Sequence, residues 1–443
     1  MKTLAWTAAA AAAATAIAGC SIGAKYTVGG TLTGLTGQGL VLEDNSGDDL
    51  ALDSNGTFVF SGGIKNGDAY SVTVKTQPSN PAQTCTVQNG SGNIDKADVT
   101  NVLVSCTQVG RFAYVANQLS NNLSAYSIDS TAGELTPIAG SPFAASGTTP
   151  AALTVDPNGQ FLYVANNGSN DVQVYSIDAT TGALTAVGLP QATGSAPDAV
   201  TVDPTDSYLY VANLASNSVS AYSIDSSSGA LAELPNSPFL VGAQPTSLKV
   251  DPSGGFLYVT DFGDGNVVVL AIDSATGSLS GISGSPFSAG AGPISISIDP
   301  TGTFAYVANE SAATISEYSL DASTGALTAV SGSPLSAGSA PEALAIDPAG
   351  RYLYAANATT ANHVAAYSIT PTTGALTLSG SPVAAGTLPS SVALDPSGQF
   401  AYVANDGSND ISVYAVDATT GVLTPVSHSP FAAGNQPRAI AID

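Results

Sequence analysis

The chain has 443 residues, 33 acidic and 9 basic side chains, and a formal net charge of −24. With so few lysine and arginine residues it cannot form the cationic surface that nucleic-acid binding requires, and its 9% of charged residues is too few for a long coiled coil. Hydrophobic residues make up 44% of the chain, which is enough for a large core, so we exclude disorder. The many glycine and proline residues favour strands joined by tight turns.

The N-terminal residues have the pattern of an export signal. Lys2 precedes an apolar stretch from Leu4 to Ala18, which is too short and too rich in alanine for a good membrane span. No other segment of the sequence is apolar enough to cross a bilayer. The stretch ends in Ile17-Ala18-Gly19-Cys20, which resembles the lipobox of bacterial lipoproteins.

This resemblance implies a signal peptide over residues 1–19, a lipid-modified Cys20 and a linker over residues 20–25. In lipoproteins a residue other than aspartate after the cysteine, here Ser21, favours the outer membrane. We therefore expect a bacterial cell-envelope protein that is held at the outer membrane by its lipid alone. The alternative is a plain secretory signal in which Cys20 has no role.

Residues 26–107 predict a small β domain. Short runs of β-forming residues alternate with turn signals such as Asn55-Gly56 and Asn66-Gly67-Asp68. The pattern from Gly30 to Gly34, with the two turns and the residues that follow them, resembles prealbumin-like or carboxypeptidase-regulatory-like β-sandwich modules. The resemblance implies a spacer role.

Two features of this domain could carry chemistry. Cys85 and Cys106 form an isolated pair in an exported chain, so we expect a disulfide; a metal site would need further ligands, and no histidine lies nearby. The acidic run Asp44–Asp49 could bind Ca²⁺, but it lacks a bidentate glutamate at the required spacing, and a solvated turn is the favoured interpretation.

Residues 110–443 are internally periodic. The motif Tyr-Val-Ala-Asn, with two variants, recurs at spacings of 49, 47, 48, 48, 48 and 48 residues. The seven copies begin at Tyr114, Tyr163, Tyr210, Tyr258, Tyr306, Tyr354 and Tyr402. About 48 residues is the length of one four-stranded propeller blade.

One unit illustrates the predicted blade. Strand A covers residues 150–157, strand B 161–166 and strand C 172–178, and strand D begins at residue 183. The last residues, Pro437–Asp443, read as a strand A that completes the first blade and closes the ring, which removes open sheet edges. The sequence therefore predicts an all-β protein: a seven-bladed β-propeller over residues 110–443, preceded by the small sandwich over residues 26–107.

The repeats resemble the lactonase-type seven-bladed propellers, which are similar to bacterial 6-phosphogluconolactonase, and the Tyr-Val-Thr-Asn repeats of surface-layer proteins. The resemblance covers about three quarters of the chain and implies the fold more strongly than any activity. In the lactonase family the position after the proline of strand A is often arginine followed by histidine. Arg438 matches this pattern, but Ala439 replaces the histidine.

Positions that differ between repeats are the candidates for an asymmetric site. The residue after each strand-A proline lies at the mouth of the central channel: Ala151, Asp198, Thr246, Ile294, Glu342, Ser390 and Arg438. Lys249, in the middle of a strand A, points into the channel or between blades. His363 opens a strand C and is the only imidazole expected near this face, because His428 lies on an outer strand.

Two function classes compete. The favoured one is a non-catalytic propeller that binds a small molecule, glycan or protein on the channel face, as a monomer, with Lys249 and Arg438 as ligand-binding residues. The alternative is hydrolysis of a sugar lactone, with Glu342 or Asp198 as general base, His363 as alternate acid–base and Arg438 as oxyanion or phosphate anchor. A purely structural surface-coat role is a third hypothesis.

The charge distribution constrains both classes. Only four basic residues lie in the repeats, namely Arg111, Lys249, Arg351 and Arg438, so the strongly negative field disfavours a phosphosugar. No cofactor or metal is required. A Ca²⁺ site at Asp261 and Asp264, or at Asp406 and Asp410, is a side hypothesis, since Gly-rich turns explain these carboxylates equally well.

Overall fold

The computed structural model describes residues 25–35, 38–78, 83–108, 112–358 and 362–443. The predicted signal peptide, Cys20 and Arg111 lie outside these residues. The regular secondary structure of these residues consists of β-strands alone. They contain no helix that is long and apolar enough to span a membrane. The chain divides into two compact units, which adjoin in the sequence at Cys106 and Thr107.

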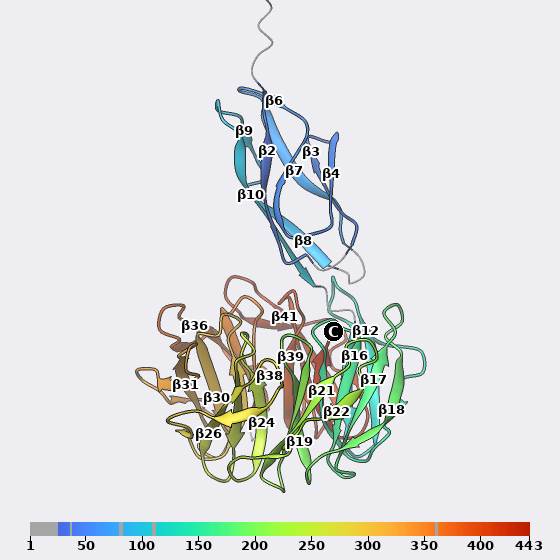
Figure 1. The fold of residues 1–443 in the computed structure, drawn as a ribbon, viewed down its shortest axis with the longest axis vertical. Helices are drawn as coiled ribbons and strands as arrows, with labels where there is room; N and C mark the ends of the chain where they lie inside the picture. Colours follow the sequence, from blue (N-terminus) through green and yellow to red (C-terminus); the bar gives the residue numbers. More distant parts are fainter. Residues whose placement is uncertain (1–24, 36–37, 79–82, 109–111, 359–361) are drawn as a thin grey trace, which may run out of the picture. The chain divides into compact units, whose positions relative to one another are not determined.

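The first unit consists of two four-stranded sheets and a two-stranded ribbon (Figure 1). One sheet has the order β5-β2-β10-β8 and the other β4-β3-β7-β9, while β1 pairs with β6. Its strands are β1 (Lys25–Tyr26), β2 (Val28–Thr33), β3 (Leu40–Asp44), β4 (Asp48–Leu52), β5 (Gly56–Val59), β6 (Ile64–Lys65), β7 (Ala69–Thr76), β8 (Gln83–Gln88), β9 (Ser91–Asn93) and β10 (Val99–Gln108).

Both sheets of the first unit contribute to one hydrophobic core, which includes Leu32, Leu42 and Val104. The predicted disulfide between Cys85 and Cys106 is present and joins β8 to β10. The acidic run is occupied by structural contacts: Asp44 accepts a hydrogen bond from the amide of Ser71, and Asp49 pairs with Lys75. These contacts favour the turn interpretation over a Ca²⁺ site.

The second unit contains, in the described part of the chain, seven antiparallel sheets of four or five strands (Figure 1). We number them sheets 1 to 7 by the order of their second strands. The innermost strands are β44 (Pro437–Ile442), β15 (Pro150–Val155), β19 (Pro197–Val202), β24 (Pro245–Val250), β29 (Pro293–Ile298), β34 (Pro341–Ile346) and β39 (Pro389–Leu394). The second strands are β11 (Phe112–Asn117), β16 (Phe161–Asn166), β20 (Tyr208–Asn213), β25 (Phe256–Asp261), β30 (Phe304–Asn309), β35 (Tyr352–Asn357) and β40 (Phe400–Asn405).

The outer strands are less regular. The third strands are β12 (Asn122–Ile128), β17 (Asp171–Ile177), β21 (Ser218–Ile224), β26 (Asn266–Ile272), β31 (Thr314–Leu320), β36 (His363–Ile369) and β41 (Asp410–Val416). The fourth are β13 (Leu135–Pro137), β18 (Leu184–Ala192), β22 (Leu231–Glu233), β27 (Leu279–Gly281), β32 (Leu327–Ala329), β37 (Leu376–Leu378) and β42 (Leu423–Pro425). Six sheets add a two-residue strand beside the third: β14 (Phe143–Ala144), β23 (Phe239–Leu240), β28 (Phe287–Ser288), β33 (Leu335–Ser336), β38 (Val383–Ala384) and β43 (Phe431–Ala432).

The sheets form a closed ring. Each innermost strand contacts the innermost strands of the two neighbouring sheets, and β44 contacts both β39 and β15. As predicted, β44 from the C-terminal end pairs with β11, so sheet 1 is built from both ends of the repeat region. The all-β propeller prediction is therefore confirmed.

Repeated residues hold neighbouring sheets together. The tyrosine of the second strand is fully buried, and in five sheets its hydroxyl donates to a turn glycine carbonyl of the next sheet, as Tyr306 does to Gly374 at 2.8 Å. The aspartate after the innermost strand accepts amide hydrogen bonds across its turn, as Asp299 does from Phe304. These repeated residues are therefore part of the scaffold.

Candidate functional site

The channel mouth is built by a bulge that recurs in every sheet. The proline that opens each innermost strand pairs with the last residue of the second strand, and the register then shifts by one residue. The residue after the proline therefore has no pairing partner on the second strand, as is typical of a β-bulge. All seven such residues line one cavity of about 170 Å³, so the predicted channel-mouth positions do meet.

The charged members of this set lie together. Asp198, Glu342 and Arg438 all line the channel cavity. Glu342 and Arg438 also line a second cavity of about 150 Å³, together with Ser390 and Asp406. One guanidinium is therefore surrounded by carboxylates from several sheets.

Burial dominates the electrostatics of these acids. It raises the pKa of Asp198 and of Asp406, and the Arg438 guanidinium offsets part of each rise. For Glu342, burial raises the pKa, the Glu310 carboxylate raises it further, and Arg438 again acts in the opposite direction. A carboxyl group with a raised pKa can exchange a proton nearer to neutral pH than an ordinary glutamate can.

Glu310 and Asp406 also belong to this group of charges. Glu310 was not among the predicted site residues, and Asp406 was predicted only as a Ca²⁺ ligand. Both directly follow the last residue of a second strand. Their amides donate to the carbonyl of the residue immediately before a strand-opening proline, Gly292 for Glu310 and Leu388 for Asp406. Aligning this position across the repeats gives acids only here, beside Gln118, Asn167, Leu214, Phe262 and Ala358. The signal was therefore available in the sequence.

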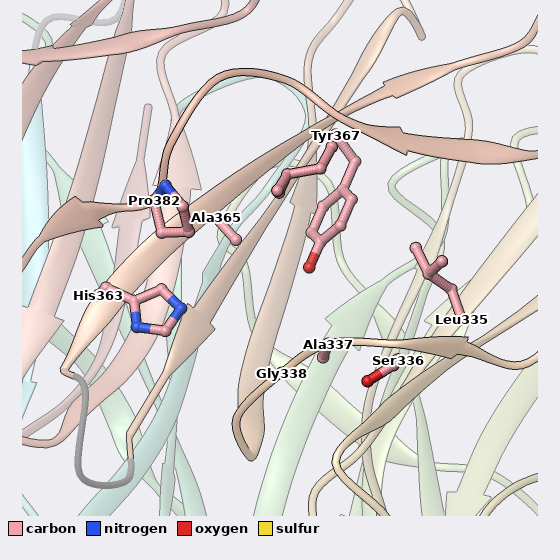
Figure 2. A pocket seen from close by; sticks show the side chains of 9 residues that line it. Leu335, Ser336, Ala337, Gly338, His363, Ala365, Tyr367 and Pro382 are labelled. Atoms are coloured by element: carbon pink, nitrogen blue, oxygen red, sulfur yellow. The ribbon is translucent and has the colours of Figure 1, made fainter.

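His363 lies in a different cavity from Arg438. It lines a crevice of about 340 Å³ with Leu335, Ala365 and Tyr367, and it lines neither of the two cavities that contain Arg438 (Figure 2). Burial lowers the pKa of its imidazole. The structure thus gives no geometric support to a joint acid–base role for His363 with Glu342.

Lys249 is also separate from the acidic group. Its side chain is exposed on innermost strand β24, inside the ring, and the surrounding strands lower its ammonium pKa by desolvation. Lys249 lines neither of the two cavities that contain Glu342 and Arg438. Its ligand-binding role stays a prediction for a deeper part of the channel.

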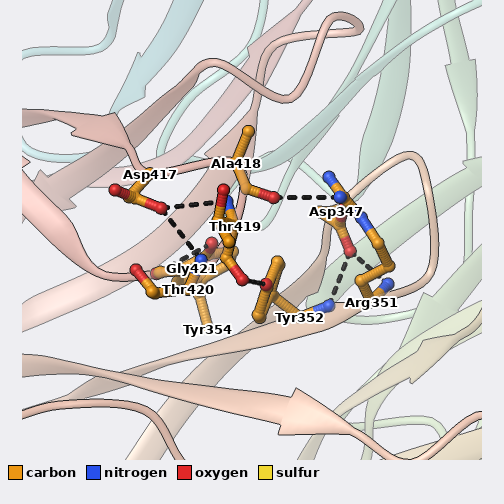
Figure 3. A network of polar contacts seen from close by, with 9 residues as sticks. All are labelled: Asp347, Arg351, Tyr352, Tyr354, Asp417, Ala418, Thr419, Thr420 and Gly421. Carbon is orange, nitrogen blue, oxygen red and sulfur yellow. Dashed lines mark hydrogen bonds and ion pairs between the residues drawn. The ribbon is translucent and has the colours of Figure 1, made fainter.

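Arg438 is free to meet a ligand, whereas Arg351 is not. The Arg351 guanidinium donates to the carbonyl of Ala418 at 2.9 Å, lies 3.5 Å from the Asp347 carboxylate and packs over the Tyr352 ring (Figure 3). Within the described residues, Arg438 has no side-chain hydrogen bond or ion pair. This half-buried guanidinium is therefore available to bind an oxygen-rich ligand in the cavity.

Cation binding finds little support at the proposed acids. The described residues contain no group of three or more His, Cys, Asp or Glu side chains that could hold a metal. Asp410 accepts hydrogen bonds from Asn405 and Ser408, and Asp264 accepts one from the amide of Ala243. These carboxylates serve the loops in which they lie.

The fold and the channel mouth define a β-propeller with an off-centre polar site at one end of its channel. A family model described as "Lactonase, 7-bladed beta-propeller" matches residues 50–249 and 241–440. The chain belongs to this lactonase family, which confirms the resemblance noted in the repeats.

Several solved structures share the fold. A candidate 6-phosphogluconolactonase from Bacteroides uniformis is 20% identical, with a TM-score of 0.67 over 76% of this chain and 100% of that one. The periplasmic gluconolactonase of Pseudomonas aeruginosa is 22% identical, with a TM-score of 0.64 over 75% of this chain and 98% of that one. A protein from Lactobacillus plantarum is 22% identical, with a TM-score of 0.65 over 76% of this chain and 100% of that one. A search of curated proteins finds no significant match.

Proposed function

We propose that this protein hydrolyses an uncharged sugar lactone at the mouth of its propeller channel. The observation that carries the proposal is the position of Glu342 and Arg438, which line the same two cavities while the guanidinium has no partner among the described residues. Membership of the lactonase family and the gluconolactonase among its structural neighbours support the same reaction class.

The chemistry follows from the two groups. The Glu342 carboxylate removes a proton from a water molecule, whose oxygen then bonds to the lactone carbonyl carbon. Arg438 stabilises the negative charge that develops on the carbonyl oxygen. The ring carbon–oxygen bond breaks, the leaving oxygen takes a proton back from Glu342, and a hydroxy acid is released. Asp198, across the same cavity, binds substrate hydroxyl groups.

The charge balance selects the substrate. Four carboxylates, Asp198, Glu310, Glu342 and Asp406, act on or beside the single Arg438 guanidinium. Their combined field repels a phosphorylated sugar but leaves an uncharged, hydroxyl-rich lactone able to donate to the carboxylates. The field also favours release of the anionic product.

The test is hydrolysis of glucono-1,5-lactone and of 6-phosphogluconolactone by the purified protein, followed by proton release in a pH-stat. We expect turnover of the neutral lactone, a loss of at least 100-fold in Glu342→Gln and in Arg438→Gln, and no loss in the control Arg351→Gln. Melting temperatures verify that the variants are folded. No turnover above background with either lactone would refute the proposal.

A second candidate is ligand binding without turnover, which Ala439 favours because lactonase-type propellers often have histidine at this position. Calorimetric titration with glucono-1,5-lactone and with gluconate distinguishes the two functions. Binding of either compound that depends on Arg438, without proton release from the lactone, would support this second function over hydrolysis.

The remaining predictions are part of the same proposal. Cys20 anchors the protein in the bacterial outer membrane, residues 26–107 form a sandwich that acts as a spacer, and residues 110–443 form a monomeric seven-bladed propeller. Cys20→Ala should move the protein from the membrane fraction to the soluble fraction. If the variant remains in the membrane fraction, the anchor is wrong.

A further inference from the structure

A crevice between sheets 5 and 6 is larger than its counterpart between sheets 7 and 1. It has a volume of about 340 Å³, within the range of small-molecule sites, and Figure 2 shows it between β36 and the segment around β33. The counterpart between sheets 7 and 1, lined by Ser124, Tyr126 and Ala432, has about 190 Å³. The crevice thus recurs at two places in the ring, and the one at sheet 6 is the larger of the two.

In the counterpart, the tyrosine of the third strand closes the space. The hydroxyl of Tyr126 donates to the carbonyl of Ala432 in the neighbouring sheet at 2.7 Å. Tyr318 and Tyr414 donate in the same way to the carbonyls of Ser288 and Ala384. The position therefore places a phenol donor opposite a carbonyl oxygen.

Tyr367 occupies this position in sheet 6 but makes no such bond. The residue as a whole is 3% exposed, and among the described residues its hydroxyl makes no hydrogen bond but remains accessible from the crevice. Figure 2 shows the hydroxyl pointing into the crevice, toward the chain near Ala337. A ligand oxygen in the crevice can accept a hydrogen bond from this hydroxyl in place of water.

Two sequence changes open the space. Ala365 stands where sheets 1, 3, 5 and 7 have a serine, so one hydroxyl is missing between His363 and Tyr367 on the same face of β36. The connection that includes β37 is also shorter, because five residues lie between Leu376 and Pro382 where six lie between Leu327 and Pro334. Both changes withdraw atoms from the crevice.

We propose that this crevice is a second binding site, independent of the channel, for a small uncharged molecule with an apolar body and a carbonyl oxygen. Tyr367 donates to that oxygen, as the matching tyrosines donate to backbone carbonyls. The apolar body contacts Leu335, Leu378 and Pro382. The lining contains no acidic or lysine or arginine side chain, which selects against ions. The imidazole of His363 offers a second polar contact.

The test uses acetophenone as the probe and ethylbenzene, which lacks the carbonyl, as its match. Full-length protein with isotope-labelled leucine methyl groups is titrated with each compound, and the signals of Leu335 and Leu378 are followed by NMR. We expect saturable shifts with acetophenone. Tyr367→Phe should weaken acetophenone binding by about 3- to 10-fold, the value of one neutral hydrogen bond, and leave ethylbenzene binding unchanged.

Matched variants separate the crevice from the rest of the ring. Ala365→Leu fills the crevice and should abolish the shifts, while Tyr126→Phe, at the smaller counterpart, should leave them unchanged. Tyr367→Phe loses no internal hydrogen bond, so its melting temperature should equal that of the wild type. The absence of saturable shifts with acetophenone, or equal acetophenone binding by wild type and Tyr367→Phe, would overturn the proposal.

Discussion

The backbone amide of Phe112 donates a 2.7 Å hydrogen bond to the carboxylate of Asp443, a residue 331 positions later in the chain. The same contact links Phe304 to Asp299 within one hairpin of sheet 5. At the junction of the ring, a turn contact between adjacent strands has thus become a contact between the two ends of the propeller. Sheet 1 depends on it and on the pairing of β11 with β44.

We expect removal of residues 437–443 to open the ring. The deletion exposes the edge of β11 and removes an innermost strand that contacts two neighbours, so the protein should unfold at a lower denaturant concentration and associate through the exposed edge. The milder Asp443→Ala leaves the Phe112 amide without this acceptor and should cost about 2 kcal/mol. Guanidinium unfolding and light scattering measure the two effects.

The control for ring closure is Asp417→Ala. Asp417 accepts two amide hydrogen bonds in its own exposed turn, so its loss should affect stability less than the loss of Asp443. A deletion variant that remains monomeric and unfolds at the wild-type midpoint would contradict the closure argument.

The tyrosines of the second strands permit a comparison within one molecule. Tyr306 and Tyr163 are both fully buried, but Tyr306 donates to Gly374, whereas the Tyr163 hydroxyl has no hydrogen-bond partner in the described part of the chain. Tyr306→Phe should therefore lower the free energy of unfolding by about 1 kcal/mol, while Tyr163→Phe should leave it unchanged or raise it. Urea unfolding measures both, and equal losses would show that packing, not the hydrogen bond, accounts for the effect.

The sequence predicted the propeller well because the fold repeats. The spacing of the Tyr-Val-Ala-Asn motif defined each sheet, and the unmatched strand from Pro437 defined the closure. In the example of sheet 2, predicted strand C began at residue 172, and β17 begins at Asp171. Such boundaries follow from local patterns of apolar and turn residues.

The site was predictable only in part. Asp198, Glu342 and Arg438 were found because they occupy one position of the repeat. Glu310 was missed because it lies on the loop after β30, and the sequence does not indicate that this loop lies near Glu342 in the folded protein. His363 was placed near Arg438 because both lie at one face of the ring, but packing between sheets puts them in different cavities.

The assignment of Glu342 as general base predicts how the pH profile of lactone hydrolysis moves. The Glu310 carboxylate raises the pKa of Glu342, so Glu310→Gln should lower that pKa and move the acidic limb of kcat/KM to lower pH. Arg438 has the opposite effect, so the residual activity of Arg438→Gln should show its acidic limb at higher pH. The pH-stat assay over pH 4–8 measures both shifts. An acidic limb that does not move in Glu310→Gln would exclude Glu342 as the base.

Sheet 4 carries the one buried carboxylate in a position that is otherwise asparagine. In sheet 1, Asn117 donates to Oδ1 of Asn122 at 2.8 Å. In sheet 4, Asp261 replaces the first asparagine and is fully buried. Among the described residues, neither its own oxygens nor Oδ1 of Asn266 has a hydrogen bond of normal geometry. Burial, with the nearby Asp264 carboxylate, raises the pKa of Asp261 to about 7.

Asp261→Asn should therefore stabilise the protein in a pH-dependent way. The folded-state pKa lies above the unfolded value of about 3.9, so ionisation of Asp261 destabilises the fold progressively as pH rises from about 4 to 7. The variant removes the free-energy cost of ionising a buried carboxyl group. Its side-chain amide can also donate a hydrogen bond to Oδ1 of Asn266, as Asn117 does to Asn122 in sheet 1. We expect it to be more stable by on the order of 2 to 4 kcal/mol at pH 8, with little gain at pH 4.

Guanidinium unfolding of wild type and Asp261→Asn at both pH values measures this difference. The matched reverse change is Asn405→Asp, because Asn405 donates to the Asp410 carboxylate at 2.7 Å and the new carboxylate would face that charge. It should destabilise the protein at pH 8 more than at pH 4. If Asp261→Asn gives the same change at pH 4 and pH 8, ionisation of Asp261 does not limit stability, and the buried acid is held by contacts that an amide reproduces.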